Sequence, residues 1–355
     1  MKIAYILPAL TPTGPINVAA DLVQVMTAHG IECVVYYFDD TSNKRVFQCP
    51  TQKISFTNYP DLSNFDILHS HGLRPDLFVL FYKLRFGKVK TVTTIHNFVF
   101  QDLISELGPI KGLLGGLLWL IVWSLHNKYV VLSETAKKYY TKYLSKSKIE
   151  VAYNTRIINK DVCISAEDSI FFKELRRKYE VVCASICRVT NRKGLDCIIS
   201  AMSQLNLPVC YVIIGDGPEL KNLKEQALCI GVSDRVFFLG NKANGYAFLP
   251  YIDIFCIPSH SEGFPLAMLE AAFYEKAVVS SDIPVFREIF SEQEIVICEE
   301  NNVESYVQGI IKAIEQKEAL SRNIKLRFDK DYSPTTFYNN YKAIYDSLVM
   351  PSHLH

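Results

Sequence analysis

The sequence predicts an α/β protein with two doubly wound domains, each built on a parallel sheet covered by helices on both faces. Three observations support this prediction. Short, continuously apolar runs alternate with helical patterns, which is typical of parallel strands buried on both faces. A polar stretch, "NKDVCISAEDSIFFKELRRKYE" at residues 159–180, interrupts this alternation near the middle of the chain. At 355 residues, the chain is long enough for two domains.

The first half of the chain carries the strand candidates of an N-terminal domain. Each is a short apolar run rich in β-branched and aromatic residues, the composition expected of strands. Between the first two lies "AADLVQVMTAHG", an amphipathic pattern closed by Gly30, a residue that favours the end of a helix. The candidates are residues 2–8, 31–38, 66–71, 90–96, 128–133 and 148–154.

Strands and helices resume after the polar stretch. "GLDCIISAMSQL" and "LKNLKEQALCIG" have helical patterns, and "SPTTFYNNYKAIYDSLV" predicts a final helix that begins with Ser-Pro. The strand candidates are residues 181–188, 209–217, 235–240, 252–259 and 277–282. We therefore expect an N-terminal domain at 1–160, a linker at 161–178, a C-terminal domain at 179–333, and a helix at about 334–350 that packs back on the first domain.

The cysteines and the N-terminus indicate a cytoplasmic protein. Ten cysteines are present, but no two are spaced as C-x-x-C, so the sequence supports neither a zinc site nor a redox motif. Several lie inside apolar runs, where Cys behaves as a small hydrophobic residue, and this usage fits a reducing compartment. The opening "MKIAYILPAL" lacks the pattern of a signal peptide and is better interpreted as a first strand.

The charges are divided unevenly, although the whole chain carries a net charge of only +1. Residues 1–160 hold 18 Lys and Arg against 11 Asp and Glu, a net +7, whereas the remainder carries −6. The excess fits an N-terminal domain that meets an anionic partner, for which we expect a membrane surface rather than nucleic acid. Ordinary variation among solvated faces is the competing interpretation.

The apolar stretch "LLGGLLWLIVWSL", residues 113–125, has two interpretations. It is shorter than the ~20 residues needed to span a bilayer. It fits either a buried core helix or a helix that lies on a membrane, with Trp119, Trp123 and Lys111 at the interface. The cations of "YKLRFGKVK", residues 82–90, would then face anionic headgroups, or else belong to a solvated loop.

The stretch "SEGFPLAMLE", residues 261–270, marks the start of a helix after a strand. The strand ends near Ser259, and the apolar helix begins near Pro265 or Leu266. Proline is favoured in a first helical turn because the amide that it lacks has no partner there. The backbone amides at this helix start are therefore expected to be free for an anion, which the helix dipole also favours.

Two glutamates flank these amides. Glu262 precedes the amides around Gly263, Phe264 and Leu266, and Glu270 shares the helix face of Leu266. Carboxylates are poor partners for phosphate but accept hydrogen bonds from hydroxyl groups. A nucleotide sugar has hydroxyls on both sides of a diphosphate, so its ribose would meet Glu270 and its sugar Glu262. A glutamate at a helix start followed by a solvated helix glutamate is the plainer interpretation of the same spacing.

A second polar loop supplies positive charge. In "ICRVTNRKGLDCIISAM", a strand ends at Arg188, and Lys193 lies just before a helix. Arg and Lys at a strand end can neutralise a diphosphate without a metal ion. The alternative is a basic surface loop. Because ligands of open α/β sheets bind outside the carboxyl ends of the strands, the recurrence of polar residues at such ends favours a binding site.

Four motifs together resemble a known family. "CRVTNRKG", "IIGDGPEL", "VFFLGN" and "PSHSEGFPLAMLEA" occur in the order and at the separations found in the nucleotide-binding half of glycosyltransferase family 4, the retaining group 1 enzymes. The resemblance is strong over residues 180–290 and moderate over 1–160. It implies the GT-B fold, in which two Rossmann-like domains face a central cleft, with the nucleotide sugar held by the second domain and the acceptor by the first.

The resemblance also implies roles for single residues in the second half. Arg188 and Lys193 correspond to the pair that grips the donor diphosphate, Glu262 to the glutamate that holds the sugar hydroxyls, and Glu270 to the one that binds ribose. The other donor-binding positions that it implies are Gly263, Phe264, Pro265 and Leu266 at the helix start, with Asn241 and Lys242 in a base-recognition loop.

In the first half, His96 of "TIHN" corresponds to a histidine beside the transferred sugar, and His71 of "HSHG" would line the acceptor side. A buried strand-end histidine is the plainer interpretation of each. Gly14 lies in the glycine loop that would meet the donor phosphate, but Pro15 follows where the family has a second glycine, and proline removes an amide donor. With Arg188, Lys193 and Glu262, His96 completes the expected catalytic set.

Two further motifs are set aside. "GDGPEL" is not a dinucleotide fingerprint, because it lacks the third glycine and has proline at the critical turn. "DKD" at residues 329–331 is similar to the metal-binding triplet of another transferase fold, but it lies in the tail and is interpreted as a solvated turn. We expect no metal ion and no cofactor, and a UDP- or GDP-linked sugar as donor substrate.

The sequence thus predicts a retaining glycosyltransferase that moves a sugar from a nucleotide diphosphate sugar to a saccharide acceptor. A lipid-linked acceptor in the synthesis of a bacterial surface polysaccharide, such as O-antigen, capsule or lipopolysaccharide, fits the basic first half and the apolar stretch. The protein would then be peripheral on the cytoplasmic face of the inner membrane. The alternatives are a GT-B nucleotide-sugar epimerase and a catalytically silent nucleotide-sugar-binding subunit.

Overall fold

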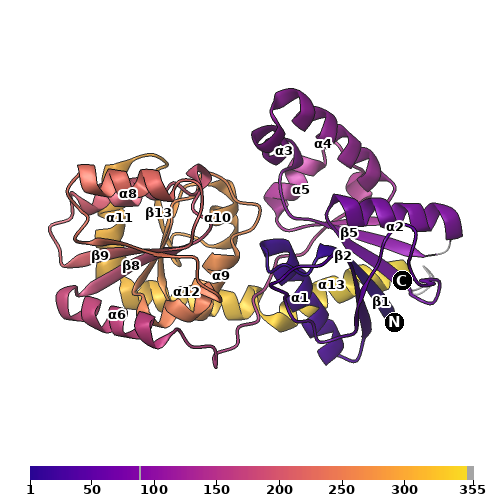
Figure 1. Cartoon of the computed structure of the whole chain (residues 1–355), viewed down its shortest axis with the longest axis horizontal. Helices are drawn as coiled ribbons and strands as arrows, with labels where there is room; N and C mark the ends of the chain where they lie inside the picture. The colour runs from indigo at the N-terminus through magenta and orange to yellow at the C-terminus, as the bar shows by residue number, and fades with distance from the viewer. Residues whose placement is uncertain (88, 350–355) are drawn as a thin grey trace. The chain divides into compact units, whose positions relative to one another are not determined.

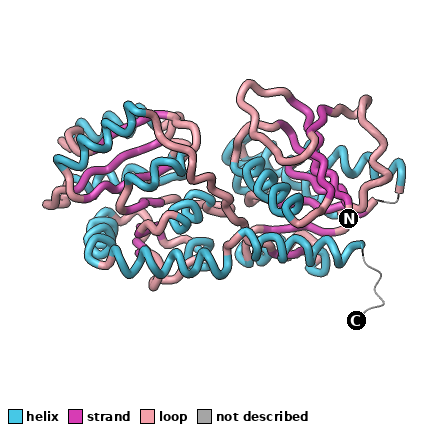
Figure 2. Tube along the Cα trace, turned by 90° about the horizontal axis from the view of Figure 1, so that it is seen from below, coloured by secondary structure: helices cyan, strands magenta, loops and turns pink. Residues whose placement is uncertain are grey.

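The structure, a computed structural model, describes residues 1–87 and 89–349 and divides into two compact units. The first unit comprises Met1–Arg156 and the chain from Tyr332 onward, and the second comprises Ile157–Asp331. Each unit has one parallel sheet with helices on both sides of the strands (Figures 1 and 2). The predicted fold class is therefore confirmed.

The first sheet has seven strands in the order β3-β2-β1-β4-β5-β6-β7. Its neighbouring strands all pair in parallel, and the central strands are buried apolar runs. The order reverses between β1 and β4, which is where ligands bind in open α/β sheets. The strands are β1 (Lys2–Ala9), β2 (Glu32–Asp39), β3 (Thr51–Lys53), β4 (Ile67–His71), β5 (Lys90–Ile95), β6 (Lys128–Val131) and β7 (Ile149–Val151).

The helices of the first unit connect these strands, and one of them comes from the end of the chain. Helix α13 packs beside α1, and the phenol of its Tyr345 reaches the ring of His69 on β4 at 2.7 Å. Helices α3 and α4 form a hairpin (Figure 1). The helices are α1 (Gly14–Ala28), α2 (Leu73–Phe86), α3 (Val99–Leu107), α4 (Pro109–Ser124), α5 (Glu134–Tyr140) and α13 (Pro334–Val349), with the short η1 (Lys146–Lys148).

The second sheet has six strands in the order β10-β9-β8-β11-β12-β13, also all parallel. Its order reverses between β8 and β11. Buried cysteines Cys183 and Cys256 lie on these two strands and fill the core as small apolar side chains. The strands are β8 (Val181–Ile186), β9 (Val209–Ile214), β10 (Val236–Gly240), β11 (Ile254–Ile257), β12 (Ala277–Ser281) and β13 (Val296–Cys298).

Helices cover both faces of the second sheet. Helices α7, α8 and α11 pack over one face, and α9 and α12 pack together on the other (Figure 1). The helices are α6 (Ala166–Lys178), α7 (Leu195–Met202), α8 (Leu220–Cys229), α9 (Leu266–Phe273), α10 (Pro284–Ile289), α11 (Val303–Glu315) and α12 (Lys317–Asp331), with the short η2 (Asn191–Lys193) and η3 (Gly245–Tyr251).

Every strand candidate from the sequence overlaps an observed strand. The prediction missed β3 and β13, which have three residues each and are too short to show a pattern. The stretch expected to be a linker contains α6, which belongs to the second unit. Its start is capped by Ser165, whose Oγ accepts a hydrogen bond from the amide of Asp168.

Candidate functional site

The loops after β8 and β11 touch through their backbones. The two strands are neighbours at the reversal of the second sheet. After β8 the chain passes Arg188, enters η2 and turns into α7 at Gly194, whose φ is +60°. A Cβ on Gly194 would lie 2.2 Å from the carbonyl oxygen of Pro258, which follows β11. Only glycine permits this conformation and this approach, so the geometry of the two loops requires glycine at position 194.

Two hydrogen bonds fasten the same loops. The amide of His260 donates to the carbonyl oxygen of Arg192 at 2.9 Å, and Nη1 of Arg192 donates to the carbonyl oxygen of Ser261 at 2.7 Å. Sequence reasoning missed Arg192, although it is next to Lys193 in the same motif. Its guanidinium adds a second cation to this side of the site.

Glu262 lies at the centre of the contacts between these loops. Its Oε1 accepts hydrogen bonds from Nζ of Lys193 at 2.5 Å and from Oγ of Ser259 at 2.7 Å, and its Oε2 lies 3.5 Å from Nη1 of Arg192. Glu262 is only 7% exposed, and a buried carboxylate needs such partners. The structure thus brings together Lys193 and Glu262, which the sequence had predicted for one site.

The helix start after Glu262 differs in one detail from the prediction. Helix α9 begins at Leu266, directly after Pro265, as expected. The amide of Leu266, however, donates to the carbonyl oxygen of Phe264 at 3.1 Å, so the prediction that this amide is free is wrong. Phe264 and Pro265 are buried, whereas Gly263 is half-buried. Glu270 follows one turn later on α9 and is also half-buried.

A pocket of about 410 Å³ lies at the carboxyl ends of β8, β9 and β10. Gly215 in its wall has a φ of +145°, and a Cβ there would lie 1.8 Å from the carbonyl oxygen of Cys187. Position 215 of the "GDG" loop therefore has to be glycine, because a side chain there would clash with the end of β8. The pocket is lined by Ile186, Cys187, Arg188, Ile214, Gly215, Asp216, Asn241, Lys242 and Gly245.

Three of the lining residues were predicted as site residues from the sequence and come from two separate loops: Arg188, Asn241 and Lys242. Lys242 is already paired, because its Nζ donates to Oδ1 of Asp168 at 2.6 Å. Asp168 is buried in the first turn of α6. The sequence did not indicate Asp168, because it lies in the stretch assigned to a linker. Gly215 and Asp216 belong to a motif that supported the family resemblance, but no binding role was predicted for them.

In the first unit, His71 and His96 lie together at the carboxyl ends of β4 and β5. Nδ1 of His71 is 2.8 Å from Nε2 of His96. His71 is only 1% exposed, so it does not form an open surface on the acceptor side, whereas His96 is half-buried. Burial lowers the pKa of His96 to about 3 and holds the pKa of His71 well below its usual range. Both rings are therefore neutral at pH 7.

Gly14 lies at the start of α1 in the first unit and is exposed. Pro15 occupies the first turn of this helix, where its missing amide leaves no backbone group unsatisfied. Gly14, His71 and His96 thus belong to one unit, and the other predicted site residues to the second.

The two tryptophans of α4 point into the first unit. Nε1 of Trp123 and Nε1 of Trp119 donate to Oδ2 of Asp76 at 2.9 and 3.2 Å. Ser70 and Thr93 donate to Oδ1 of the same carboxylate at 2.6 and 2.8 Å. Trp123 is 1% exposed and Trp119 is half-buried. The interpretation of these rings as membrane-interface residues is therefore wrong, because their polar edges are bound inside the domain.

The opposite side of α4 is apolar and exposed. Gly112 and Gly116 face α3. A Cβ on Gly112 would lie 2.5 Å from Ile104 and one on Gly116 would lie 2.5 Å from Phe100, so both glycines are needed for the close packing of the hairpin. The remaining apolar side chains are spaced i, i+3, i+4 along one face and are 46–75% exposed. We call them the leucine stripe: Ile110, Leu113, Leu114, Leu117, Leu118 and Ile121.

Some cations expected to face a membrane have other partners. Nζ of Lys83 donates to the carbonyl oxygen of Leu125 at 2.8 Å, and Lys148 likewise binds the carbonyl oxygen of Ser124 at 3.0 Å. Both therefore satisfy backbone groups at the end of α4 and complement its dipole. Lys88 lies outside the described residues. Of the cations that the sequence had placed at a membrane, Arg85, Lys90 and Lys111 are exposed.

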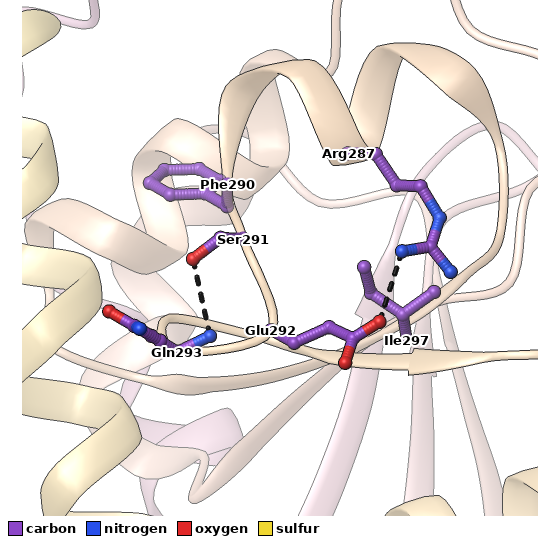
Figure 3. Close-up of a pocket in the computed structure, with 6 residues that line it drawn as sticks. All are labelled: Arg287, Phe290, Ser291, Glu292, Gln293 and Ile297. Carbon is purple, nitrogen blue, oxygen red and sulfur yellow. Dashed lines mark hydrogen bonds and ion pairs between the residues drawn. The ribbon is translucent and has the colours of Figure 1, made fainter.

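Two other features of the second unit could in principle form a site. A surface hollow of about 350 Å³ near β13 is lined by Arg287, Phe290, Ser291, Glu292, Gln293 and Ile297 (Figure 3). Arg287 is already paired with Asp282 and Glu292, so the hollow presents no uncompensated cation. "DKD" at 329–331 ends helix α12, where Asp329 and Asp331 pair with Lys325 and Arg327; the prediction of a turn is wrong. Within residues 1–87 and 89–349, no group of three His, Cys, Asp or Glu is arranged to hold a metal ion.

None of the helices in the described part of the chain is both long enough and apolar enough to span a membrane. The 16 residues of α4 fall short of that length.

The chain is similar to known proteins over nearly its whole length. It is 31% identical to the O-antigen biosynthesis glycosyltransferase WclY of Escherichia coli, over 98% of this chain and 99% of that protein. It is 25% identical to the N,N'-diacetylbacillosaminyl-diphospho-undecaprenol α-1,3-N-acetylgalactosaminyltransferase of Campylobacter jejuni, over about half of each chain. The crystal structure of HepE from Anabaena in complex with UDP-glucose superposes with a TM-score of 0.78 at 16% identity, covering 98% of this chain and all of that one.

Models of two family halves match in the same order as the two units. The model described as glycosyltransferase family 4 matches residues 13–155, and the model described as glycosyl transferases group 1 matches residues 166–327. Together with the E. coli relative, which aligns over 98% of this chain, these matches cover both sheets and the loops at their strand ends. The chain therefore belongs to the group 1 glycosyltransferases of family 4, and it is a transferase enzyme of the GT-B fold.

Proposed function

We propose that the protein transfers a sugar from a nucleotide diphosphate sugar to a lipid-linked saccharide, with retention of the anomeric configuration, during synthesis of a bacterial surface polysaccharide such as O-antigen. The observation that carries this proposal is the cluster of Lys193, Arg192 and Glu262 at the sheet reversal. Two cations and one buried carboxylate match a ligand that presents phosphate beside hydroxyl groups. The full-length similarity to an O-antigen glycosyltransferase supports the same conclusion.

In this proposal, the donor diphosphate binds beside Arg188 and Lys193. Departure of the nucleoside diphosphate leaves negative charge on its terminal phosphate, and fixed cations in a partly buried site stabilise that charge in the transition state. Glu262 accepts hydrogen bonds from hydroxyls of the transferred sugar, and Glu270 from those of the ribose. His96 is the polar group proposed to lie beside the transferred sugar. The departing phosphate helps to deprotonate the acceptor hydroxyl, so no carboxylate has to act as a covalent nucleophile.

The nucleoside base would occupy the pocket of about 410 Å³ next to Arg188. The pairing of Lys242 with Asp168 gives the wall of this pocket a fixed position, because the lysine is tied to a helix start. UDP- and GDP-linked sugars are both candidate donors, and the UDP-glucose complex of the Anabaena protein favours testing uridine nucleotides first.

We further propose that the leucine stripe rests on an anionic membrane, where the lipid-linked acceptor is available. The stripe is exposed along one helix face, and residues 109–125 contain no carboxylate. Lys111 lies on the same helix and is exposed, as are Arg85 and Lys90 elsewhere in the unit, and each cation near an anionic surface contributes about 1 kcal/mol. The protein would then act at the cytoplasmic face of the inner membrane. Charge favours lipid over a second copy of this chain, which would bring like charges together.

The proposal is tested by product analysis with radiolabelled nucleotide sugars, in the presence and absence of extracted undecaprenyl-linked saccharides. Transfer that requires the acceptor supports it, whereas conversion of the donor sugar without acceptor indicates an epimerase. Lys193→Ala should lower kcat by ~10²–10³, the usual cost of removing an electrostatic contact in the transition state. Lys221→Ala, which removes an exposed lysine of α8 in the same domain, is the matched control and should leave turnover unchanged. Normal turnover of the Lys193 variant would refute the site assignment.

A further inference from the structure

The two histidines of the first unit share a single proton between facing nitrogens. Nδ1 of His71 and Nε2 of His96 lie 2.8 Å apart, within hydrogen-bonding distance. Burial keeps both rings neutral at pH 7, and each neutral ring carries one N–H. One ring must therefore donate and the other accept, so the pair has two arrangements.

The surroundings of His71 distinguish these arrangements. Its Nε2 is buried and has no hydrogen-bond partner in the part of the chain that the structure describes. If His96 were the donor, the proton of His71 would lie on this Nε2 as a buried N–H without an acceptor, and such orphaned N–H groups are rare. If His71 donates instead, its Nε2 keeps only an unshared lone pair. The second arrangement leaves the other proton on Nδ1 of His96, which hydrogen-bonds to no group among residues 1–87 and 89–349.

We propose that His71 is a positioning residue that holds His96 with its proton on Nδ1, so that His96 presents an N–H donor to an oxygen of a sugar or phosphate group bound at the carboxyl ends of β4 and β5. The biochemical meaning of this inference rests on the proposed function, but the tautomer itself does not. A donor at this position suits a sugar hydroxyl or a phosphate oxygen, both of which accept hydrogen bonds. In the opposite tautomer, His96 would present a lone pair and repel a phosphate oxygen.

The tautomer can be read directly without an activity assay. ¹⁵N-labelled histidine in the full-length protein gives separate ring-nitrogen resonances for protonated and unprotonated nitrogens, and the spectrum of His96→Gln identifies those of His96. At pH 7 we expect Nδ1 of His96 to be protonated and its Nε2 to be unprotonated. The same is expected of the two ring nitrogens of His71. A proton on Nε2 of His96 would overturn the proposal.

Variants test whether the tautomer matters for transfer. His71→Leu introduces an apolar side chain of similar size and removes the N–H donor. The expected fall in kcat is about 10- to 100-fold, the range found for groups that orient metal-binding histidines, with little change in KM for the nucleotide sugar. His71→Asn places an amide near the position of Nδ1 and should recover most of kcat. The loss should also vanish in a His96→Ala background, because His71 acts only through His96.

His69→Leu is the matched control. His69 is equally buried on the same face of β4, but it binds Tyr345 and Thr94 rather than His96. This variant should lose stability and keep kcat once the folded fraction is taken into account. Equal losses of kcat in both leucine variants, or a full loss from His71→Leu in the His96→Ala background, would show that His71 is only structural. If the wild-type protein transfers no sugar while the resonances show the expected tautomer, the proposed function fails and the tautomer stands.

Discussion

Lys193 and Glu262 bind each other in the absence of a ligand, with Nζ of the lysine 2.5 Å from Oε1 of the glutamate. The carboxylate therefore neutralises the cation that is proposed to bind the donor diphosphate. A bound diphosphate would compete with Glu262 for Lys193, because the attraction of one ammonium group is divided between the two anions. Under the proposed function, we therefore expect Glu262 to have opposite effects on two steps, weakening the binding of the diphosphate and aiding transfer of the sugar.

Glu262→Gln should separate these effects. The amide keeps the shape of the side chain and removes the negative charge, so the nucleoside diphosphate should bind about 3- to 10-fold more tightly, a gain of about 1 kcal/mol. Turnover should fall by ~10²–10³ because the contact with the sugar hydroxyls is weakened. Isothermal titration with UDP and GDP measures the first effect, and steady-state assays measure the second. Glu270→Gln is the control, since loss of a ribose contact should weaken binding. Weaker binding by the Glu262 variant would contradict the argument.

Transfer should continue in excess EDTA. Arg188, Lys193 and Arg192 supply positive charge near the proposed diphosphate position, which is the electrostatic contribution that Mg²⁺ makes in metal-dependent transferases. The measurement is initial rate after extensive chelation and again after Mg²⁺ or Mn²⁺ is restored. Complete loss of transfer that either metal reverses would disprove metal independence.

Tryptophan fluorescence should titrate with the carboxyl of Asp76. Burial raises the pKa of Asp76 to about 6, and both tryptophans of the chain donate to this group. The emission of the wild type should therefore change with a midpoint near pH 6, and Asp76→Asn should abolish the transition. A midpoint that is unchanged in the variant would assign the transition to another group.

The same shift has a defined effect on stability. The folded pKa of Asp76 is higher than its ordinary value of 3.8, so the folded protein binds this proton more tightly than the unfolded chain does. The contribution of Asp76 is therefore fully present below about pH 4 and is lost as the pH rises through about 6. Chemical denaturation should show that the free energy of unfolding of wild type, relative to Asp76→Asn, increases between pH 7 and pH 5.

Binding to vesicles should depend on the leucine stripe. Replacing Leu114, Leu117 and Ile121 by Gln removes exposed apolar area and should abolish co-sedimentation with vesicles that contain phosphatidylglycerol. Higher salt should weaken wild-type binding, because attraction to the surface is screened over about 8 Å at physiological ionic strength. Leu228→Gln, at a residue 71% exposed on α8, is the control and should bind like wild type. Binding that is indifferent to lipid charge and to the stripe would refute the membrane proposal.

The strands and the main site motifs could be predicted because their causes are local. Apolar runs mark buried parallel strands, and the pairs Lys193–Gly194 and Glu262–Gly263 follow strand ends directly. The direction of Trp119 and Trp123 could not be predicted, because their partner Asp76 lies more than 40 residues away. The pairing of Lys242 with Asp168 was hidden for the same reason. Tryptophan in general favours a membrane interface, but here the hydrogen bonds from both indole groups to buried Asp76 hold the rings inside the domain.

The chain leaves the first unit and re-enters it at neighbouring points. Oγ1 of Thr155 donates to the carbonyl oxygen of Tyr332 at 2.6 Å, and the returning helix α13 places Tyr345 against His69. During synthesis on the ribosome, the second unit is therefore translated in full before the first, which waits for helix α13. A chain cut shortly after Asp331 would lack a helix that covers buried histidines and tyrosines. The quality-control machinery of the cell would then encounter a chain whose C-terminal domain is complete and whose N-terminal domain is not.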